Sequence, residues 1–135
     1  MAAITGVDHF GVTVSDVEHA LAFWRDQLGL VEVGRGVIEW VELRIPSGGT
    51  VELSRYHRPV GAPVAPGEEN EPGRSHISLL VDDLGSMLAA LRADGVRART
   101  DEPVDIPVGA YAGGKAAYVF DPDGVEVELI QRRGG

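Results

Sequence analysis

Two histidines and two glutamates stand in matching places of a sequence that repeats itself in kind. His9 lies in the segment Asp-His-Phe-Gly-Val, and His76 lies in the related segment Ser-His-Ile-Ser-Leu. A helix pattern follows each segment, and each copy then continues to a Val-Glu-Leu strand that carries a glutamate. Two imidazoles and two carboxylates suit a divalent metal ion. If the two copies pack about a pseudo-twofold axis, four side chains can meet at one metal site: His9, Glu52, His76 and Glu128.

The composition limits the chemistry that these residues can perform. With no cysteine in 135 residues, disulfides, thiolate zinc sites and cysteine nucleophiles are excluded, so a metal must use histidine and carboxylate ligands. The formal net charge of -9, with lysine and arginine scattered, argues against nucleic acid and favours a small-molecule substrate. The sequence has no apolar run that could cross a bilayer and no signal-peptide pattern at its start. We therefore expect a cytoplasmic protein that binds neither nucleic acid nor membrane.

The first copy predicts the element order β-α-β-β-β. Ser15 and Glu18 have the spacing of a capping box that opens a helix, and Gly29 is the expected end of that helix. Apolar residues recur within it at helical spacing and form one stripe for packing against a sheet. The stripe consists of Val17, Leu21, Trp24 and Leu28. The strands of this copy are expected over residues 6–14, 30–33, 37–45 and 50–56.

The second copy repeats the order. Its helix should open at Asp82 or Asp83 and end near Gly95. The apolar stripe of that helix consists of Leu84, Met87, Leu88 and Leu91. Its strands are expected over residues 75–81, 96–99, 115–120 and 125–131. Two segments rich in proline, glycine and acidic residues are expected to be loops, a linker at 57–73 and a possible lid at 101–114.

These elements predict one α+β domain over residues 1–135. Its tandem βαβββ modules should span residues 4–56 and 74–131, with residues 57–73 as the linker between them. A chain of this length suits a single compact domain, or two small halves that share a core. The expected architecture is a curved mixed sheet around a metal cavity.

Side-chain alternation along the strands tests whether the four candidate ligands share one kind of face. Successive residues of a strand point to opposite faces of a sheet. Glu52 lies between Val51 and Leu53, and His9 alternates with the apolar side chains of its own strand. The same alternation holds around His76 and Glu128, so all four lie opposite the aliphatic face that packs on a helix. Burying four such residues unpaired would cost several kcal/mol, which favours a solvated cavity or a metal.

Four segments of the chain resemble one known protein family. They are residues 8–16 (DHFGVTVSD), 22–30 (AFWRDQLGL), 75–79 (SHISL) and 120–129 (FDPDGVEVEL). Together these segments are similar to the vicinal oxygen chelate superfamily, which includes glyoxalase I, methylmalonyl-CoA epimerase, extradiol dioxygenases and bleomycin resistance proteins. The resemblance covers nearly the whole chain. It implies a glyoxalase-like half-barrel built from the paired modules, but it does not select one activity, because fold alone does not give function.

By this resemblance, the metal positions fall on His9, Glu52, His76 and Glu128. The resemblance leaves the metal open among Ni, Co, Zn, Mn and Fe. Four protein ligands leave about two positions of a six-coordinate metal, enough for two neighbouring oxygens of a substrate. This favours a divalent-metal-dependent isomerase or lyase that moves a proton through an enediolate. The alternatives are an Fe(II)-dependent ring-cleaving or oxidising dioxygenase, and a metal-free small-molecule binding or antibiotic resistance protein.

The resemblance also suggests which carboxylate moves the proton. In glyoxalase-like members a ligand glutamate acts as the base, which implies Glu128 or Glu52 here. In epimerase-like members a nearby glutamate that is not a ligand has been implicated, and Glu42 matches it, on the cavity side of its strand. Glu126 has the same parity as Glu128, but its place at a strand start predicts exposure. Aromatic residues with the parity to line the cavity are Trp40, Tyr56, Tyr118 and Phe120.

The quaternary arrangement follows from the sheet edges. Half-barrel sheets leave strand edges that need cover, and we therefore expect a homodimer. The metal site can then lie within one chain or be shared across the dimer.

Overall fold

The computed structural model of the protein describes residues 2, 6–36, 39–57, 60–68 and 70–134. Contacts divide the chain into two compact units, Met1–Pro63 and Val64–Gly135, each of which is described by itself. The first unit contains β1 (His9–Thr13), α1 (Val17–Leu21), the π-helix η1 (Ala22–Gln27), β2 (Val31–Gly36), β3 (Trp40–Arg44) and β4 (Thr50–Ser54). The second contains β5 (Ile77–Leu80), α2 (Leu84–Ala93), β6 (Val104–Asp105), β7 (Lys115–Phe120) and β8 (Glu126–Gln131). Both units have the predicted order β-α-β-β-β.

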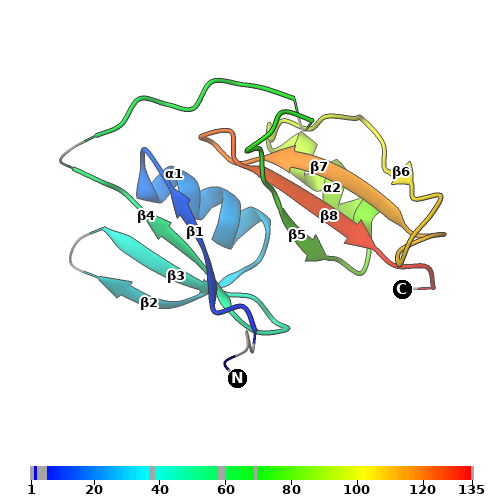
Figure 1. Cartoon of the computed structure of the whole chain (residues 1–135), viewed down its shortest axis with the longest axis horizontal. Helices are drawn as coiled ribbons and strands as arrows, with labels where there is room; N and C mark the ends of the chain where they lie inside the picture. Colours follow the sequence, from blue (N-terminus) through cyan, green and yellow to red (C-terminus); the bar gives the residue numbers. More distant parts are fainter. Residues whose placement is uncertain (1, 3–5, 37–38, 58–59, 69, 135) are drawn as a thin grey trace. The chain divides into compact units, whose positions relative to one another are not determined.

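The first unit is a four-stranded mixed sheet with a helix on one face (Figure 1). The strands lie in the order β1-β4-β3-β2. β1 pairs with β4 in parallel, and the other two pairs are antiparallel. The alternation of the sequence is observed in β3 and β4, where every second side chain is buried. The core between helix and sheet contains Leu21, Trp24, Val41, Leu43, Val51 and Leu53, each exposed by 1% or less.

The first helix differs from the prediction at its start and in its second half. Asp16, not Ser15, is the N-cap: its carboxylate accepts a hydrogen bond from the backbone N–H of His19 at 2.9 Å. From Ala22 onward the helix widens to a π-helix, in which Leu28 N–H donates to the carbonyl of Phe23. The predicted apolar stripe is nevertheless buried along its whole length. Gly29 ends the helix as predicted, with a φ of 79° that favours glycine.

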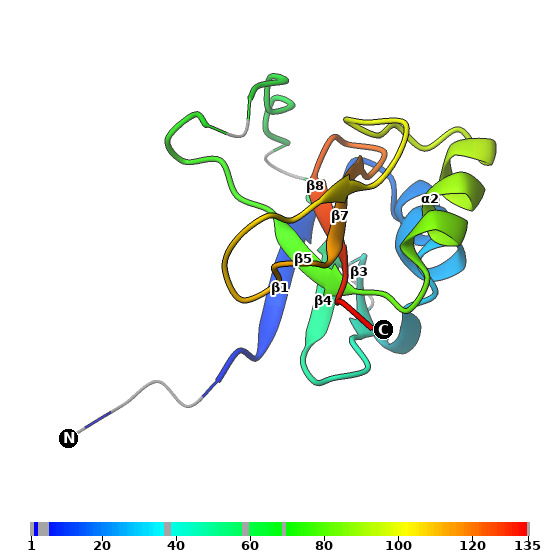
Figure 2. The same cartoon turned by 90° about the vertical axis from the view of Figure 1, so that its right-hand side faces the viewer.

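The second unit repeats this plan with the strand order β5-β8-β7-β6. β5 and β8 are parallel, and the remaining pairs are antiparallel. Helix α2 opens at Asp83, whose carboxylate accepts hydrogen bonds from both Ser86 N–H (3.0 Å) and Ser86 Oγ (2.7 Å). Figure 2 shows α2 along one side of this sheet, where it packs on β7 and β8. Its buried residues are Leu84, Leu88 and Leu91.

One predicted strand of the second copy is wrong. Residues 96–99 form only an isolated bridge, Ala98 to Val119, and the chain turns away where Thr100 Oγ1 donates to the carbonyl of Glu102 at 2.8 Å. The strand that completes the sheet is β6. It is only two residues long and lies within the segment 101–114 that was predicted to be a loop. An ion pair between Lys115 and Asp105, 2.8 Å long, ties it to β7.

Other strand boundaries move by a few residues. β1 and β5 are shorter than predicted, so that His76 directly precedes β5, whereas β2 continues to Gly36. Residues 37 and 38, predicted to begin a strand, lie outside the described residues. The fold is α+β, as predicted, and each of the two βαβββ modules forms a four-stranded mixed sheet of its own. No helix in the described part of the chain is long and apolar enough to span a membrane.

Candidate functional site

The first unit places three candidate residues on the sheet face opposite its helix. His9 lies on β1, Glu52 on β4 and Glu42 on β3. Glu52 is directly opposite Gly11 on one side and Glu42 on the other, and Glu42 is opposite Gly34. These four residues form a row across the sheet, which we call the first row: Gly11, Glu52, Glu42 and Gly34. Directly opposed carboxylates repel each other, so this row favours a bound cation.

His9 is held in an orientation that suits metal binding. Its Nδ1 lies 2.9 Å from Asp8 Oδ2, which leaves Nε2 as the nitrogen that can coordinate. Metal-bound histidines commonly donate their other ring N–H to a carboxylate in this way. The hydrogen bond to Asp8 raises the pKa of His9; burial opposes this, and the negative charges of Glu52 and Glu42 add to the rise. The same carboxylates would attract a divalent cation to this face.

Glycine opens one flank of the first row, at Gly11, a feature that the sequence did not predict. At the other flank, a Cβ on Gly34 would lie 3.4 Å from Glu42 Oε2. A Cβ added at Gly11 would meet no atom of the described residues within 4 Å, so within the described part of the first unit the space beside Gly11 is open. Gly36 differs, because a Cβ there would lie 1.9 Å from Nε1 of Trp40. The Trp40 indole therefore lies across Gly36, half-buried beside Glu42, in the place expected of an aromatic wall. Strand glycines often mark the close approach of a ligand or another chain.

The second unit brings His76 and Glu128 into direct contact on its own sheet. His76 Nε2 lies 3.2 Å from Glu128 Oε2. Glu128 on β8 is directly opposite Ser78 on β5 and Tyr118 on β7, and we call these three residues the second row. Tyr118 donates a hydrogen bond to Glu128 Oε1 at 2.9 Å, and Ser78 Oγ donates to Oε2. The ring of His76 packs edge-on against Tyr118, with the centroids 5.6 Å apart.

The two hydroxyl donors were not predicted. Tyr118 was expected only as part of an aromatic wall, and Ser78 was assigned no role. The available signal was register: a residue directly opposite a candidate ligand in a neighbouring strand is within reach of it. That register depends on strand pairing, which local sequence patterns do not specify.

Glu126 corrects a further expectation. It was predicted to be exposed but is 8% exposed, because Arg99 holds both of its oxygens, at 2.7 and 3.2 Å. Arg99 also lies over the ring of Phe120, as does Arg97. Glu126 is therefore a structural partner of Arg99. Phe120 is half-buried beneath these guanidinium groups, whereas the fourth expected wall residue, Tyr56, is 60% exposed after the end of β4.

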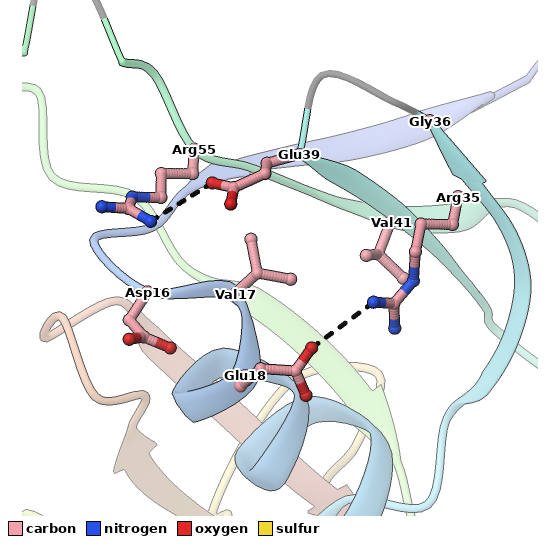
Figure 3. Close-up of a pocket in the computed structure, with 8 residues that line it drawn as sticks. All are labelled: Asp16, Val17, Glu18, Arg35, Gly36, Glu39, Val41 and Arg55. Carbon is pink, nitrogen blue, oxygen red and sulfur yellow. Dashed lines mark hydrogen bonds and ion pairs between the residues drawn. The ribbon is translucent and has the colours of Figure 1, made fainter.

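A pocket of about 200 Å³ lies elsewhere, on the helix side of the first sheet (Figure 3). Its charged side chains compensate one another: Arg35 pairs with Glu18 at 3.4 Å and Arg55 pairs with Glu39 at 3.3 Å. Asp16 is engaged as the helix cap. None of the candidate ligands lines this pocket, and its charges are already paired. We therefore do not assign it to the chemistry of the first row.

Each unit offers one histidine and one glutamate of the predicted ligand set. In neither unit do the described residues gather three or more histidine or acidic side chains in one place that could hold a metal ion. Each does offer one imidazole and one carboxylate, which are donors that divalent transition metals accept. The donor types and the Asp8–His9 hydrogen bond fit a metal. The joining of both pairs into one four-ligand centre stays a prediction.

Two βαβββ units with matching histidines and glutamates are typical of one class of proteins. Comparison of the chain with models of known protein families identifies this class. The model of the Glyoxalase/Bleomycin resistance protein/Dioxygenase superfamily matches residues 6–129. The chain therefore belongs to this superfamily, as its motifs predicted. The superfamily includes enzymes as well as proteins without catalytic activity.

Individual relatives support the fold over nearly the full chain. YwbC, an uncharacterized protein of Bacillus subtilis (strain 168), is 26% identical over 131 residues, 93% of this chain and 97% of YwbC. A superfamily member from Sphaerobacter thermophilus DSM 20745 has a crystal structure with a TM-score of 0.71 and 26% identity, covering 96% of this chain and 98% of that one. Lactoylglutathione lyase from Agrobacterium tumefaciens has a TM-score of 0.68 at 19% identity, with 96% and 95% coverage. This last likeness shows the fold alone.

Proposed function

We propose that the protein is a divalent-metal-dependent isomerase or lyase that moves a proton in a small substrate with two neighbouring oxygens. The observation that carries this proposal is that the two units carry the same candidate ligands. In a member of this superfamily, both sheets present one histidine and one glutamate on the face away from the helix. A face that served only solubility gives no reason for that match to occur twice. We infer that His9, Glu52, His76 and Glu128 together hold Ni, Co, Zn, Mn or Fe.

The residues of the chain would divide the work of the reaction. When bound, a divalent metal polarises the two substrate oxygens and stabilises the negative charge that develops as a neighbouring C–H proton leaves. Asp8 orients His9, and the hydroxyls of the second row orient Glu128. One of three carboxylates, Glu128, Glu52 or Glu42, would accept the proton and return it. Trp40 would pack against the substrate and exclude water.

The acidic pair in the first row favours this reaction over oxygen chemistry. A fourth protein ligand leaves about two open metal positions, which suffice for a chelating substrate but are crowded for a substrate and dioxygen together. A protein that only sequesters a drug would not require the histidines and glutamates at all. The Fe(II) dioxygenase and the metal-free binding protein are thus less favoured, and the experiment below distinguishes both of them from the proposed enzyme.

We also propose a cytoplasmic homodimer that acts on a small molecule. The edge strand β2 carries Val31 and Val33, which are 59% and 42% exposed. Exposed apolar edge strands favour pairing with a second chain. A dimer in which a second chain pairs with this edge would satisfy the unpaired backbone groups of β2.

Metal loading and proton exchange test the proposed reaction. The full chain, stripped by chelator and reloaded with Ni²⁺, Co²⁺, Mn²⁺ or Zn²⁺, is incubated in D₂O with a panel of α-hydroxy ketones that includes 2-hydroxyacetophenone. We expect NMR to show metal-dependent deuterium incorporation at the carbon beside the carbonyl. Oxygen consumption with Fe²⁺ would support the dioxygenase instead. A protein that holds no metal at micromolar concentrations would overturn the proposal and support the metal-free binding protein.

A further inference from the structure

Two arginines, Arg97 and Arg99, lie on the same face of the second sheet as the second row. The segment 97–99 runs antiparallel beside β7 and is bridged to it at Ala98 and Val119. Two backbone hydrogen bonds, of 2.9 and 3.0 Å, flank this bridge. Val119 is fully buried on the side of α2, and directly opposed residues point to one face while their chain neighbours point to the other. Both arginines therefore lie on the face away from the helix.

Phe120 gathers the two guanidinium groups over its ring. The Cζ atoms of Arg97 and Arg99 lie 5.3 and 5.2 Å from the ring centroid, within the range of a cation–π contact. The charge of Arg99 is balanced, because Arg99 donates to both oxygens of Glu126. Arg97 is exposed, and no carboxylate of the described residues pairs with it. This cluster is thus locally positive on a chain whose net charge is -9.

A carboxylate from the linker already lies against this cluster. Glu68 Oε2 is 3.6 Å from Arg99 Nη1, and the side chain of Glu68 is 76% exposed. The distance is longer than that of a hydrogen bond, and exposed ion pairs of this kind contribute little to stability. Glu68 therefore marks a position that a carboxylate can take, and it holds that position weakly.

We propose that Arg97, Arg99 and Phe120 form a binding site for a carboxylate group of the substrate, and that Glu68 occupies part of this site until the substrate enters. Guanidinium groups bind carboxylates through paired hydrogen bonds, and the ring of Phe120 offers an apolar surface to the adjoining part of the substrate. The substrate class is then a small organic acid with two neighbouring oxygens. This assignment rests on the proposed function for the neighbouring oxygens alone, since the carboxylate site needs no metal.

The carboxylate site lies within reach of the second row. The bridge sets Arg99 opposite Tyr118, and Tyr118 donates a hydrogen bond to Glu128 at 2.9 Å. The segment 97–99 and β8 are therefore separated by two strand spacings, about 10 Å. A substituted benzene ring can span that distance. A substrate held by its carboxylate at Arg97 would thus place its other end beside Glu128.

Titration with two ketones that differ by one carboxylate tests the site. The full chain is stripped of metal by chelator and dialysed, and 2-hydroxyacetophenone and 4-(hydroxyacetyl)benzoate are added separately while NMR follows binding. We expect the benzoate to bind about 10-fold more tightly than the neutral ketone, the usual scale of a hydrogen bond between charged groups. Equal affinities for wild type would overturn the carboxylate site.

Arg97→Leu should abolish the advantage of the benzoate and leave the affinity for the neutral ketone unchanged. Arg97 is substituted rather than Arg99 because it is exposed and does not hold Glu126. Arg132→Leu is the matched control, because it removes the same charge from an arginine that also lies over an aromatic ring, 5.3 Å from the centroid of Tyr111. Arg132 follows Gln131, which pairs with the opposite end of β7, so this variant should bind as wild type does. An equal loss in both variants would overturn the site, and circular dichroism checks that both fold.

Glu68→Gln tests the occupant from the linker. Removing a competing carboxylate should strengthen binding of 4-(hydroxyacetyl)benzoate about 2- to 5-fold and leave the neutral ketone unaffected. An unchanged affinity for the benzoate would overturn the role of Glu68. Failure of the metal-loaded protein to exchange deuterium into either ketone, with the benzoate still bound through Arg97, would instead overturn the proposed function and leave the carboxylate site standing.

Discussion

The candidate faces of the two sheets carry the same ligand types in opposite surroundings. In the first row, glycines flank two directly opposed carboxylates, and the row is acidic. In the second row, a serine and a tyrosine donate to a single carboxylate, and the face is crowded and hydrogen-bonded. The two copies share their candidate ligands and differ in the cross-strand neighbours of those residues. A repeated motif therefore does not imply a repeated role, because strand neighbours decide how firmly a ligand is held.

The contrast extends to ion pairs that support the two sheets. In the second unit Arg99 holds the nearly buried Glu126 with two hydrogen bonds. In the first unit Arg35 holds Glu32 with two hydrogen bonds as well, but Arg35 is exposed and Glu32 on β2 is only half-buried. Buried and exposed pairs of similar geometry differ greatly in their contribution to stability.

The largest effect is therefore expected in the second unit. Arg99→Leu leaves Glu126 buried without its partner and should lower the free energy of unfolding by about 3 kcal/mol. Urea denaturation followed by circular dichroism measures this change. Arg35→Leu is the matched control and should leave the unfolding midpoint unchanged within error. Equal midpoints for the two variants would show that the ion pairs do not distinguish the sheets.

A change in stability of intermediate size is expected from glycine substitutions on the first sheet, and these substitutions test whether the space at Gly11 is open. Gly36→Ala forces a Cβ against the Trp40 indole and should lower the free energy of unfolding by about 1–3 kcal/mol, the usual cost of overpacking. Gly11→Ala places its Cβ in open space and should not destabilise, since alanine in a strand loses less entropy than glycine. Thermal unfolding of the two variants measures both. Destabilisation by Gly11→Ala would show that the flank of Glu52 is not open.

The smallest change in stability is expected at the helix caps. Each unit has an aspartate as the N-cap of its helix, Asp16 in the first and Asp83 in the second. The hydrogen bonds from Ser86 lower the pKa of Asp83, and the bond from His19 N–H lowers that of Asp16. A carboxyl group with a lowered folded pKa stabilises the fold above its unfolded pKa near 3.8, and the contribution disappears as the pH falls through the folded value. Asp83→Ala should lower the melting temperature by about 3 °C at pH 7.

The pH profile supplies the control for that variant. The difference between wild type and Asp83→Ala should shrink as the pH falls below 4, because protonation removes the cap from the wild type as well. Asp16→Ala should also lose stability at pH 7, since the Asp16 carboxylate caps the first helix through backbone N–H groups. A loss in Asp83→Ala that is the same at pH 7 and pH 3 would contradict the cap as its cause.

The sequence predicted the local features of this fold well. Hydrophobic spacing located both helices, and alternation located the burial pattern of β3 and β4, because each depends on residues within one element. The predictions from sequence were wrong where two neighbouring residues or segments could occupy the same structural position. Asp16 replaced Ser15 as the cap, and the segment around Ala98 forms one bridge while β6 completes the sheet. Residues that depend on a neighbouring strand, such as the Arg99 partner of Glu126, were also missed.

By itself, the sequence determined the superfamily, the doubled βαβββ plan and the identity of the candidate ligands on the faces away from the helices. These follow from residue type and from periods of 2 and 3.6 residues, which any short stretch of chain expresses. Only the tertiary structure decided that Glu128 is held between Ser78 and Tyr118 while Glu52 lies between Gly11 and Glu42. That difference depends on strand order and register, which arise from contacts between residues far apart in the chain.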